Sequence, residues 1–378
     1  MCRSTTASAH ISGVRGLAGG DGGSARRGPF AASPVAGRRA GQILGAARRA
    51  SPSATGASLA WRAAPRRTAA YPLERATSLT VCYVRSVVMP AQAREASAAL
   101  LSSGDEESLA LSLRRAGRSV IEHRGRYWME APRGFYQPIH WMARLRADEA
   151  TLPRRLAWGY RATLCDEDCG THGNAALPVH LLADVAGYTF EALSGRRRRD
   201  LRVCGKRATI VELTGPELLR EQGLEVKRSA VRRTGYGEAD SRELYLADLD
   251  HFFMPGSHLV LAGIVDGRLG GYLTGTRVRG SAYIDNVSIA TEALRSAIGV
   301  GMVFEFVQAC RRGSGVREVV FGLDSVEDPS LVAFKESFGF PVMRVPAKVR
   351  INRFVAAVVR RRRPHQYYRL TGIAPADR

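Results

Sequence analysis

The clearest pattern of hydrophobic and polar positions begins at His258, where three short apolar segments follow one another. The first two are separated by Asp266-Gly267, a dipeptide favoured in the two-residue turns of β-hairpins. Arg279-Gly280 marks a second turn before the third segment. Short apolar segments between turn signals favour strands. The predicted strands span 258–265, 269–278 and 281–290.

A helical pattern follows the third strand. Apolar residues recur at i, i+3, i+4 and i+7 from Val300 to Val307 and form one continuous face. Pro329 then stands in the first turn of a second, shorter helix. This order favours an α+β fold with helices against a mixed β-sheet. The predicted elements are a helix over 295–312, a strand over 317–323, a helix over 328–338 and a strand over 341–351.

The pattern upstream of His258 is less regular. Thr214 and Glu217 have the spacing of a capping box, which indicates the start of a helix. The elements predicted upstream are a helix over 105–118, a strand over 119–130, a helical segment over 182–213 with an interruption at Gly195, and a helix over 214–224.

The first 88 residues have a composition of their own, dominated by Ala, Gly, Ser, Pro and Arg. A segment of this kind cannot bury enough apolar surface to offset the entropy of ordering, so we predict disorder. It is either a transit peptide or, as we favour, upstream sequence wrongly included before a true start at Met89.

The net charge of +21 is spread unevenly. Residues 1–88 contribute +11 and residues 357–378 contribute +5, so the remainder is only mildly basic. The overall charge therefore does not indicate a nucleic-acid partner. The run Arg196–Arg199 is either a solvated face or a site for an anionic substrate or a donor's phosphates.

The six cysteines lack the dense spacing of a disulfide-rich secreted domain, which favours a reducing compartment, the cytoplasm. Cys165, Cys169 and His172 have an atypical spacing for zinc ligands, so we expect loop residues and no metal site. No apolar run reaches the roughly 18 residues that a membrane-spanning helix needs.

The elements over residues 258–351 have the order of the GNAT acyl-CoA transferase core, and the segment LRSAIGVG resembles its donor loop. In that superfamily the end of the central strand holds the thioester arm of acetyl-CoA, and a glycine-bearing loop before the next helix cradles the pyrophosphate. Close helix–sheet packing is the alternative role of the glycines. Ser296 stands where the superfamily has Gln or Arg. The donor-binding residues that the resemblance implies are Ile289, Thr291, Arg295, Ser296, Ala297, Gly299, Val300 and Gly301.

The segment FKESFGF resembles the F-K-x-x-F-G element of the FemAB-like branch of this superfamily. The resemblance gives Asp328 the donor-side position at the start of a helix and gives Lys335 the place of a Tyr beside the donor's sulfur. Lys335 is either an exposed helix lysine or a catalytic cation that stabilises the tetrahedral intermediate or the departing thiolate.

Several residues qualify as a general base. Asp285 is favoured because a carboxylate on the central strand can face the cleft where an amine would lie. The other candidates are His251, Glu292, Asp324 and Glu327.

The resemblance implies an N-acyltransferase that moves an acyl group, in first place acetyl from acetyl-CoA, to a small-molecule or peptide amine. Two alternatives stay open. One is a FemAB-type transferase that uses aminoacyl-tRNA, the single case in which we expect a nucleic-acid partner, and the other is a non-catalytic GNAT-fold binding protein. The expected domains are a disordered, transit or wrongly included segment at 1–88, a partial N-terminal companion domain at 89–180, a GNAT-like acyltransferase domain at 181–356 and a basic tail at 357–378.

Overall fold

The computed structural model describes residues 90–235, 241–254, 256 and 258–373, all of which belong to one compact unit. The expectations for residues 1–88 and for a start at Met89 lie outside the described residues. Within the described ranges, no helix is long and apolar enough to cross a membrane. The cytoplasmic location and the domain boundaries stay predictions.

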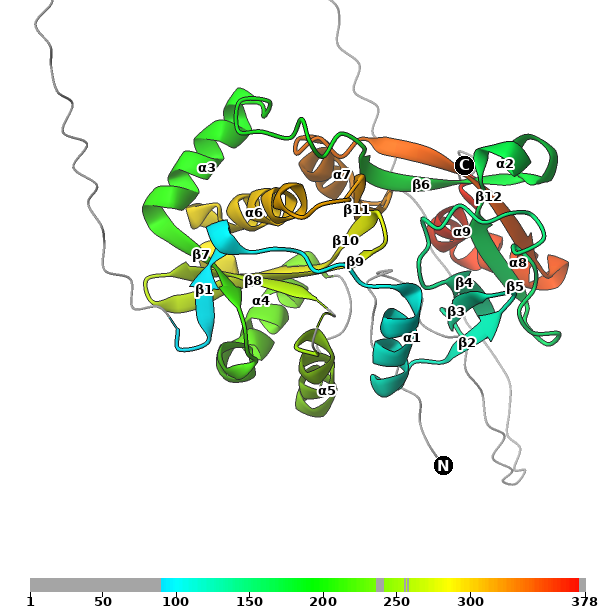
Figure 1. The fold of residues 1–378 in the computed structure, drawn as a ribbon, viewed down its shortest axis with the longest axis horizontal. Coiled ribbons are helices and arrows are strands. Elements are labelled where there is room, and N and C mark those ends of the chain that lie inside the picture. The colour runs from blue at the N-terminus through cyan, green and yellow to red at the C-terminus, as the bar shows by residue number, and fades with distance from the viewer. Residues whose placement is uncertain (1–89, 236–240, 255, 257, 374–378) are drawn as a thin grey trace, which may run out of the picture. The chain divides into compact units, whose positions relative to one another are not determined.

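The backbone of the fold is a mixed β-sheet of twelve strands (Figure 1). The strands are β1 (Ala93–Glu95), β2 (Val120–His123), β3 (Arg126–Glu130), β4 (Phe135–Pro138), β5 (Gly159–Thr163), β6 (Ala175–Leu182), β7 (Ala208–Leu213), β8 (Leu259–Val265), β9 (Arg268–Val278), β10 (Ser281–Ile289), β11 (Glu318–Leu323) and β12 (Val342–Ile351). Their order in the sheet is β1-β7-β8-β9-β10-β11-β6-β12-β5-β4-β3-β2.

Helices cover both faces of the part of the sheet between β7 and β10 (Figure 1). The helices are α1 (Glu106–Arg115), α2 (Asp166–His172), α3 (Gly195–Arg207), α4 (Leu224–Thr234), α5 (Arg242–Phe252), α6 (Ile298–Arg312), α7 (Pro329–Glu336), α8 (Arg353–Arg362) and α9 (Pro364–Thr371), with short helical turns η1 (Ala96–Ala98), η2 (Leu219–Gly223) and η3 (Thr291–Ser296). The long helix α6 buries the apolar face that its sequence predicts, including Val300, Val303 and Val307, and α4 lies on the opposite face.

The parallel strands β10 and β11 pair over a short stretch and then separate. Their register runs from Ser281↔Glu318 to Tyr283↔Val320, although β10 continues to Ile289. On its other side, β11 pairs with β6. The second half of β10 therefore has β9 on one side and an opening on the side of β11.

Strand β12 joins the two halves of the sheet. It pairs with β6 from Val342 to Ala347 and with β5 from Ala347 to Ile351. The segment that the sequence assigns to a companion domain thus contributes β1 to β6 to the same sheet as the strands that follow.

The predicted α+β fold with a mixed sheet between helices is confirmed. The hairpin turn at Asp266-Gly267 has positive φ angles of 49° and 78°, as a primed turn requires. The sequential strands from β8 to β10, the helix α6, the strand β11, the helix α7 and the strand β12 follow the predicted order.

The prediction of helix over residues 182–213 was wrong outside α3, which ends at Arg207. The residues that follow form β7, because the β-branched side chains of Thr209, Ile210 and Val211 suit a strand and pair with β8. The segment expected as a basic tail forms the end of α8 and then α9, whose residues from Tyr368 to Thr371 are buried.

Candidate functional site

A β-bulge lies in the middle of β10. The register with β9 shifts between Ile284 and Asn286, so Asp285 has no residue opposite it. Bulges re-aim side chains and are common beside active sites. Asp285 is also two residues beyond Tyr283, the last β10 residue that pairs with β11. The candidate base thus stands where the sheet opens.

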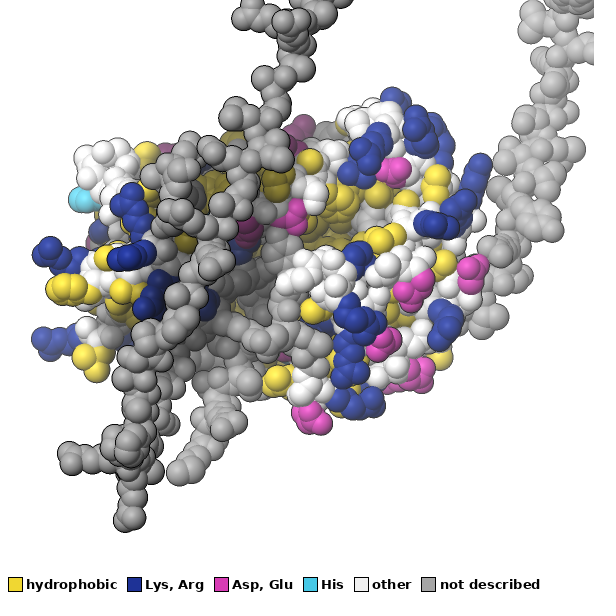
Figure 2. Space-filling model, turned by 180° about the vertical axis from the view of Figure 1, so that it is seen from behind, with side chains coloured by type: hydrophobic (Ala, Val, Ile, Leu, Met, Phe, Trp, Pro, Cys, Tyr) yellow, Lys and Arg dark blue, Asp and Glu magenta, His cyan; other side chains and the backbone are white. Residues whose placement is uncertain are grey.

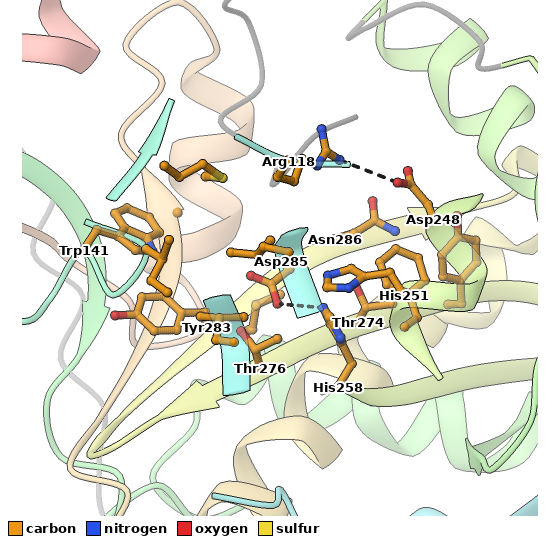
Figure 3. Close-up of a pocket in the computed structure, with 18 of the residues that line it drawn as sticks. Arg118, Trp141, Asp248, His251, His258, Thr274, Thr276, Tyr283, Asp285 and Asn286 are labelled. Carbon is orange, nitrogen blue, oxygen red and sulfur yellow. Dashed lines mark ion pairs between the residues drawn. The ribbon is translucent and has the colours of Figure 1, made fainter. Parts of the chain in front are cut away.

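Asp285 faces a pocket of about 100 Å³ over β9 and β10 (Figure 3). The alternating residues Tyr272, Thr274 and Thr276 of β9 line its floor, because side chains two apart share one face of a strand. Apolar side chains from α1, α5 and the β3–β4 region form much of its wall: Leu109, Leu113, Met129, Ile139, Trp141 and Phe252.

Three buried polar atoms at this pocket have no hydrogen-bond partner among the described residues: Asp285 Oδ2, Thr274 Oγ1 and His258 Nδ1. Burying a polar atom without a partner is costly, so such atoms mark a place for water or a ligand. His258 Nε2 lies 4.0 Å from Asp285 Oδ2, beyond the range of a direct hydrogen bond (Figure 3). The cluster can therefore accept hydrogen bonds from a bound N–H group.

Burial sets the charge state of Asp285. Its side chain is 26% exposed, and loss of hydration raises its pKa to about 7, although hydrogen bonding with Thr276 acts in the opposite direction. A carboxyl group with this pKa is present in both protonation states near neutral pH, which suits a general base.

Two histidines next to Asp285 are neutral at that pH. Burial lowers the pKa of His258 well below its usual range, with a smaller effect from His251. Burial and the charge of Arg118 lower the pKa of His251 to about 4. The two rings lie edge to face at 4.7 Å, and His251 Nδ1 is 2.8 Å from Ser112 Oγ. The neutral ring of His258 offers its Nδ1 for a hydrogen bond without neutralising the carboxylate.

Lys335 is buried rather than exposed on its helix, with 7% of its surface accessible. Its Nζ donates a hydrogen bond of 3.2 Å to the carbonyl of Leu323 at the end of β11, and lies 5.4 Å from the ring centre of Phe321. Burial and the charge of Arg369 lower its pKa to about 8. Gly322 lines the pocket, and a Cβ at that position would lie 3.6 Å from Lys335 Nζ. Lys335 therefore lies beside the end of β11, next to Gly322 but not itself in the lining of the pocket.

The proposed donor residues at the end of β10 are held by α4. Thr291 N donates to Ser229 Oγ at 3.0 Å, and Arg233 Nη1 donates to the carbonyl of Ile289 at 2.8 Å. These contacts fix the backbone that leaves the central strand and place a guanidinium group beside it.

The turn before α6 has a left-handed residue. Ala297 has φ 58° and is the N-cap of α6, and no described side chain caps that helix. Ser296 is buried and donates to the carbonyl of Ala293 at 2.6 Å, whereas Arg295 is exposed. Val300 N already donates to the carbonyl of Ala297 at 3.0 Å, so only the residues before Val300 can offer N–H groups at this end, which is the end of a helix that anions favour.

Gly299 and Gly301 are packing residues in this structure. A Cβ at Gly299 would lie 2.4 Å from Cδ1 of Ile289, and one at Gly301 would lie 2.5 Å from Sγ of Cys204 in α3. The geometry thus favours the alternative role for these glycines, close approach of α6 to its neighbours, over direct contact with phosphates.

The remaining candidate acids do not line this pocket. Asp328 caps α7, where its Oδ1 accepts from the N–H groups of Ser330 and Leu331 at 3.1 and 3.0 Å. The other acids have these positions: Asp324 accepts from Tyr368 at 2.8 Å, Glu327 pairs with Arg369, and Glu292 is exposed on η3.

The arginine run on α3 divides between surface and interior. Arg196 and Arg199 are exposed, but Arg197 is buried with its guanidinium 4.5 Å from the ring centre of Phe338 and donates to Ser337 Oγ. Arg197 therefore joins α3 to the end of α7. In the part of the chain that the structure describes, no group of three or more His, Cys, Asp or Glu is placed to hold a metal ion.

Sequence reasoning missed His258 and Thr274, which complete the polar cluster around Asp285. The available signal was the row of hydroxyl groups at Tyr272, Thr274 and Thr276 on one face of an otherwise apolar strand.

No protein-family model matches this chain, and no curated protein matches it by sequence. Solved structures with a similar arrangement include FemX, at 9% identity over 66% of this chain and 92% of that one, with a TM-score of 0.48. L-PGS from Bacillus licheniformis has 13% identity over 73% of this chain and 99% of that one, with a TM-score of 0.45. A C-terminal DUF2156 domain from Agrobacterium fabrum has 13% identity over 69% and 91%, with a TM-score of 0.47. Because these values are low, the function has to be inferred from the site.

Proposed function

We propose that this chain is an acyltransferase that moves an acyl group from a thioester donor to a primary amine held against Asp285. The observation that carries the proposal is the position of Asp285. It stands at a bulge where β10 and β11 separate, and one unpartnered oxygen faces the pocket. The pocket would hold the acceptor, and the opening would hold the donor.

The unpartnered atoms indicate the acceptor's reactive group. A primary ammonium has three N–H donors, and Asp285 Oδ2, Thr274 Oγ1 and a ring nitrogen of His258 are acceptors for them. The apolar wall formed by α1, α5 and Trp141 fits an apolar body attached to that amine.

Acetyl-CoA is the proposed donor. Beyond Tyr283 the edge of β10 no longer pairs with β11, so its backbone groups are placed to bond an extended pantetheine arm. The uncapped N-terminus of α6 and the exposed Arg295 fit a phosphate group nearby. The exposed Arg196 and Arg199 of α3 favour a second candidate donor, aminoacyl-tRNA, whose phosphates they would contact.

The transfer requires one proton to leave the ammonium before attack. The carboxylate of Asp285 would take that proton, and the amine nitrogen would then attack the thioester carbon. A C–N bond forms as the C–S bond breaks, and the second amine proton ends on the leaving thiolate. Lys335 would stabilise the negative charge that develops on the thiolate, since its ammonium lies beside Gly322 of β11, which lines the pocket.

Release of thiol from acetyl-CoA in the presence of primary alkylamines tests the proposal. Asp285→Asn should lower kcat about 100-fold or more, because it removes the base, while the affinity for CoA changes little. Asp266→Asn makes the same chemical change in the exposed β8–β9 turn and is the control. Full turnover in the Asp285 variant would show that Asp285 is not the base. Transfer from aminoacyl-tRNA but not from acetyl-CoA would show that the proposed donor is wrong.

A further inference from the structure

The helix α8 exposes apolar side chains among arginines. Phe354 is 74% exposed and Val358 is 43% exposed, one turn apart on the same helix face. No residue of α8 is buried, although Val355 and Val359 are partly covered. A large aromatic side chain left in water on a helix that buries so little indicates a surface that is covered in use.

A second exposed apolar residue lies at the same edge of the sheet. Leu156 is 99% exposed and precedes β5, while Phe354 follows β12. These two strands pair at Gly159↔Ile351, and Asn352 N donates to the carbonyl of Trp158 at 2.7 Å. Leu156 and Phe354 are each three residues beyond that strand pair. We call this surface the α8 edge; it comprises Arg133, Arg154, Arg155, Leu156, Arg350, Arg353, Phe354, Val358, Arg360, Arg361 and Arg362.

The charge of the α8 edge is uniformly positive. Its arginines are exposed, and the segments that carry every member except Arg133 contain no Asp or Glu over residues 150–165 and 337–376; Glu130 is the acid nearest to Arg133 along the chain. Within the described ranges, the arginines of the α8 edge form no ion pairs. Figure 2 is turned by 180° from Figure 1, so the right edge of Figure 1, where α8 lies, is the left edge of Figure 2. Lys or Arg and hydrophobic side chains project together at that edge.

We propose that the α8 edge docks on an anionic lipid surface. Phe354, Val358 and Leu156 would enter the boundary between headgroups and acyl chains, and the surrounding arginines would contact lipid phosphates. The combination of apolar and basic side chains favours a lipid surface over a nucleic acid. A nucleic acid would contact the arginines but would leave the aliphatic side chain of Leu156 in water. The proposal does not depend on the reaction that the chain performs.

Co-sedimentation of the full chain with phosphatidylcholine vesicles, with and without phosphatidylglycerol, tests the proposal. Binding should require the anionic lipid and fall when salt is raised, because exposed charges are screened. Phe354→Ser combined with Leu156→Ser should weaken binding about tenfold, since it removes both apolar anchors while keeping every charge. Leu100→Ser, at a leucine that is 53% exposed elsewhere on the chain, is the matched control and should change binding less than twofold.

A second pair of variants tests the charges. Arg361→Gln with Arg362→Gln should weaken binding by an order of magnitude or more, about fivefold for each arginine. Arg196→Gln with Arg199→Gln removes two exposed arginines from α3 and should have a smaller effect. Residues 1–88 add the same background of arginines to every variant. The proposal is overturned if the α8-edge variants bind vesicles like the wild type. It is also overturned if a short oligonucleotide binds tightly and loses affinity with Arg361 and Arg362 but not with Phe354 and Leu156.

Discussion

Asp285 shows how one residue acquires chemistry from its surroundings. Its carboxyl group has an unpartnered oxygen and a pKa near 7 because the bulge turns it into a poorly hydrated pocket. The sequence predicted this candidate, since Asp285 is the one acid in an apolar strand. It could not predict His258 and Thr274 beside it, because a Thr in a strand is usually there for its β-branched shape.

Lys335→Met should lower turnover about 100-fold and leave the affinity for CoA nearly unchanged, because a cation at this place meets negative charge that develops only during transfer. Met keeps most of the buried aliphatic length. Lys348→Met is a close control. Lys348 Nζ also donates to a backbone carbonyl at 3.2 Å, but this carbonyl is that of Ala147, and Lys348 lies on β12, which contacts α2. Titration of CoA and thiol release measure the two effects, and equal turnover in both variants would leave Lys335 a structural role alone.

At the scale of elements, the opening between β10 and β11 is what the sequence could least predict. The apolar patterns of residues 281–290 and 317–323 predicted two strands correctly. Where two strands stop pairing depends on contacts far away in the chain. Here β11 is also paired on its other side with β6, which comes from a part of the chain with no clear pattern. The miss at β7 has another reason: the predicted helix was extended past α3 over residues whose β-branched side chains suit a strand and pair with β8.

The glycines of α6 give a prediction at this scale. Gly301→Val should lower the free energy of unfolding by about 1–3 kcal/mol, because the side chain would meet Cys204 and Ile210 in a packed interface. Gly205→Val is the matched change on α3, at a glycine whose Cβ would meet nothing within 4 Å. Urea unfolding compares them. If Gly301→Val lost CoA affinity at unchanged stability, the glycine would line the donor after all.

At the scale of the whole molecule, the C-terminal helix α9 bonds to residues that lie next to the pocket or contact its lining. Tyr368 donates to Asp324 at 2.8 Å, just after β11. The fully buried Arg161 donates to the carbonyl of Arg369 and to Gln137, which lines the pocket. The sequence suggested a basic tail here because charge dominates its composition, whereas its buried residues matter only once the sheet is formed.

Tyr368→Phe should therefore destabilise the fold by about 1–3 kcal/mol, since it leaves the buried carboxyl group of Asp324 short of a donor. Tyr367→Phe, at the preceding and less buried tyrosine, should change stability by less than about 0.5 kcal/mol. Thermal or urea unfolding measures both, and equal effects would mean that α9 does not depend on this hydrogen bond.

The pH dependence of kcat/KM tests the central claim most directly. A primary alkylamine acceptor has a pKa of about 10, so it stays an ammonium below roughly pH 9 and leaves the enzyme's own groups to set the profile. Because burial raises the pKa of Asp285 to about 7, the active carboxylate is present above that pH and is lost below it. The account predicts that kcat/KM falls about tenfold per pH unit below 7 in the wild type and that Asp285→Asn abolishes this break. A break near pH 7 that persists in Asp285→Asn would show that another group is the base.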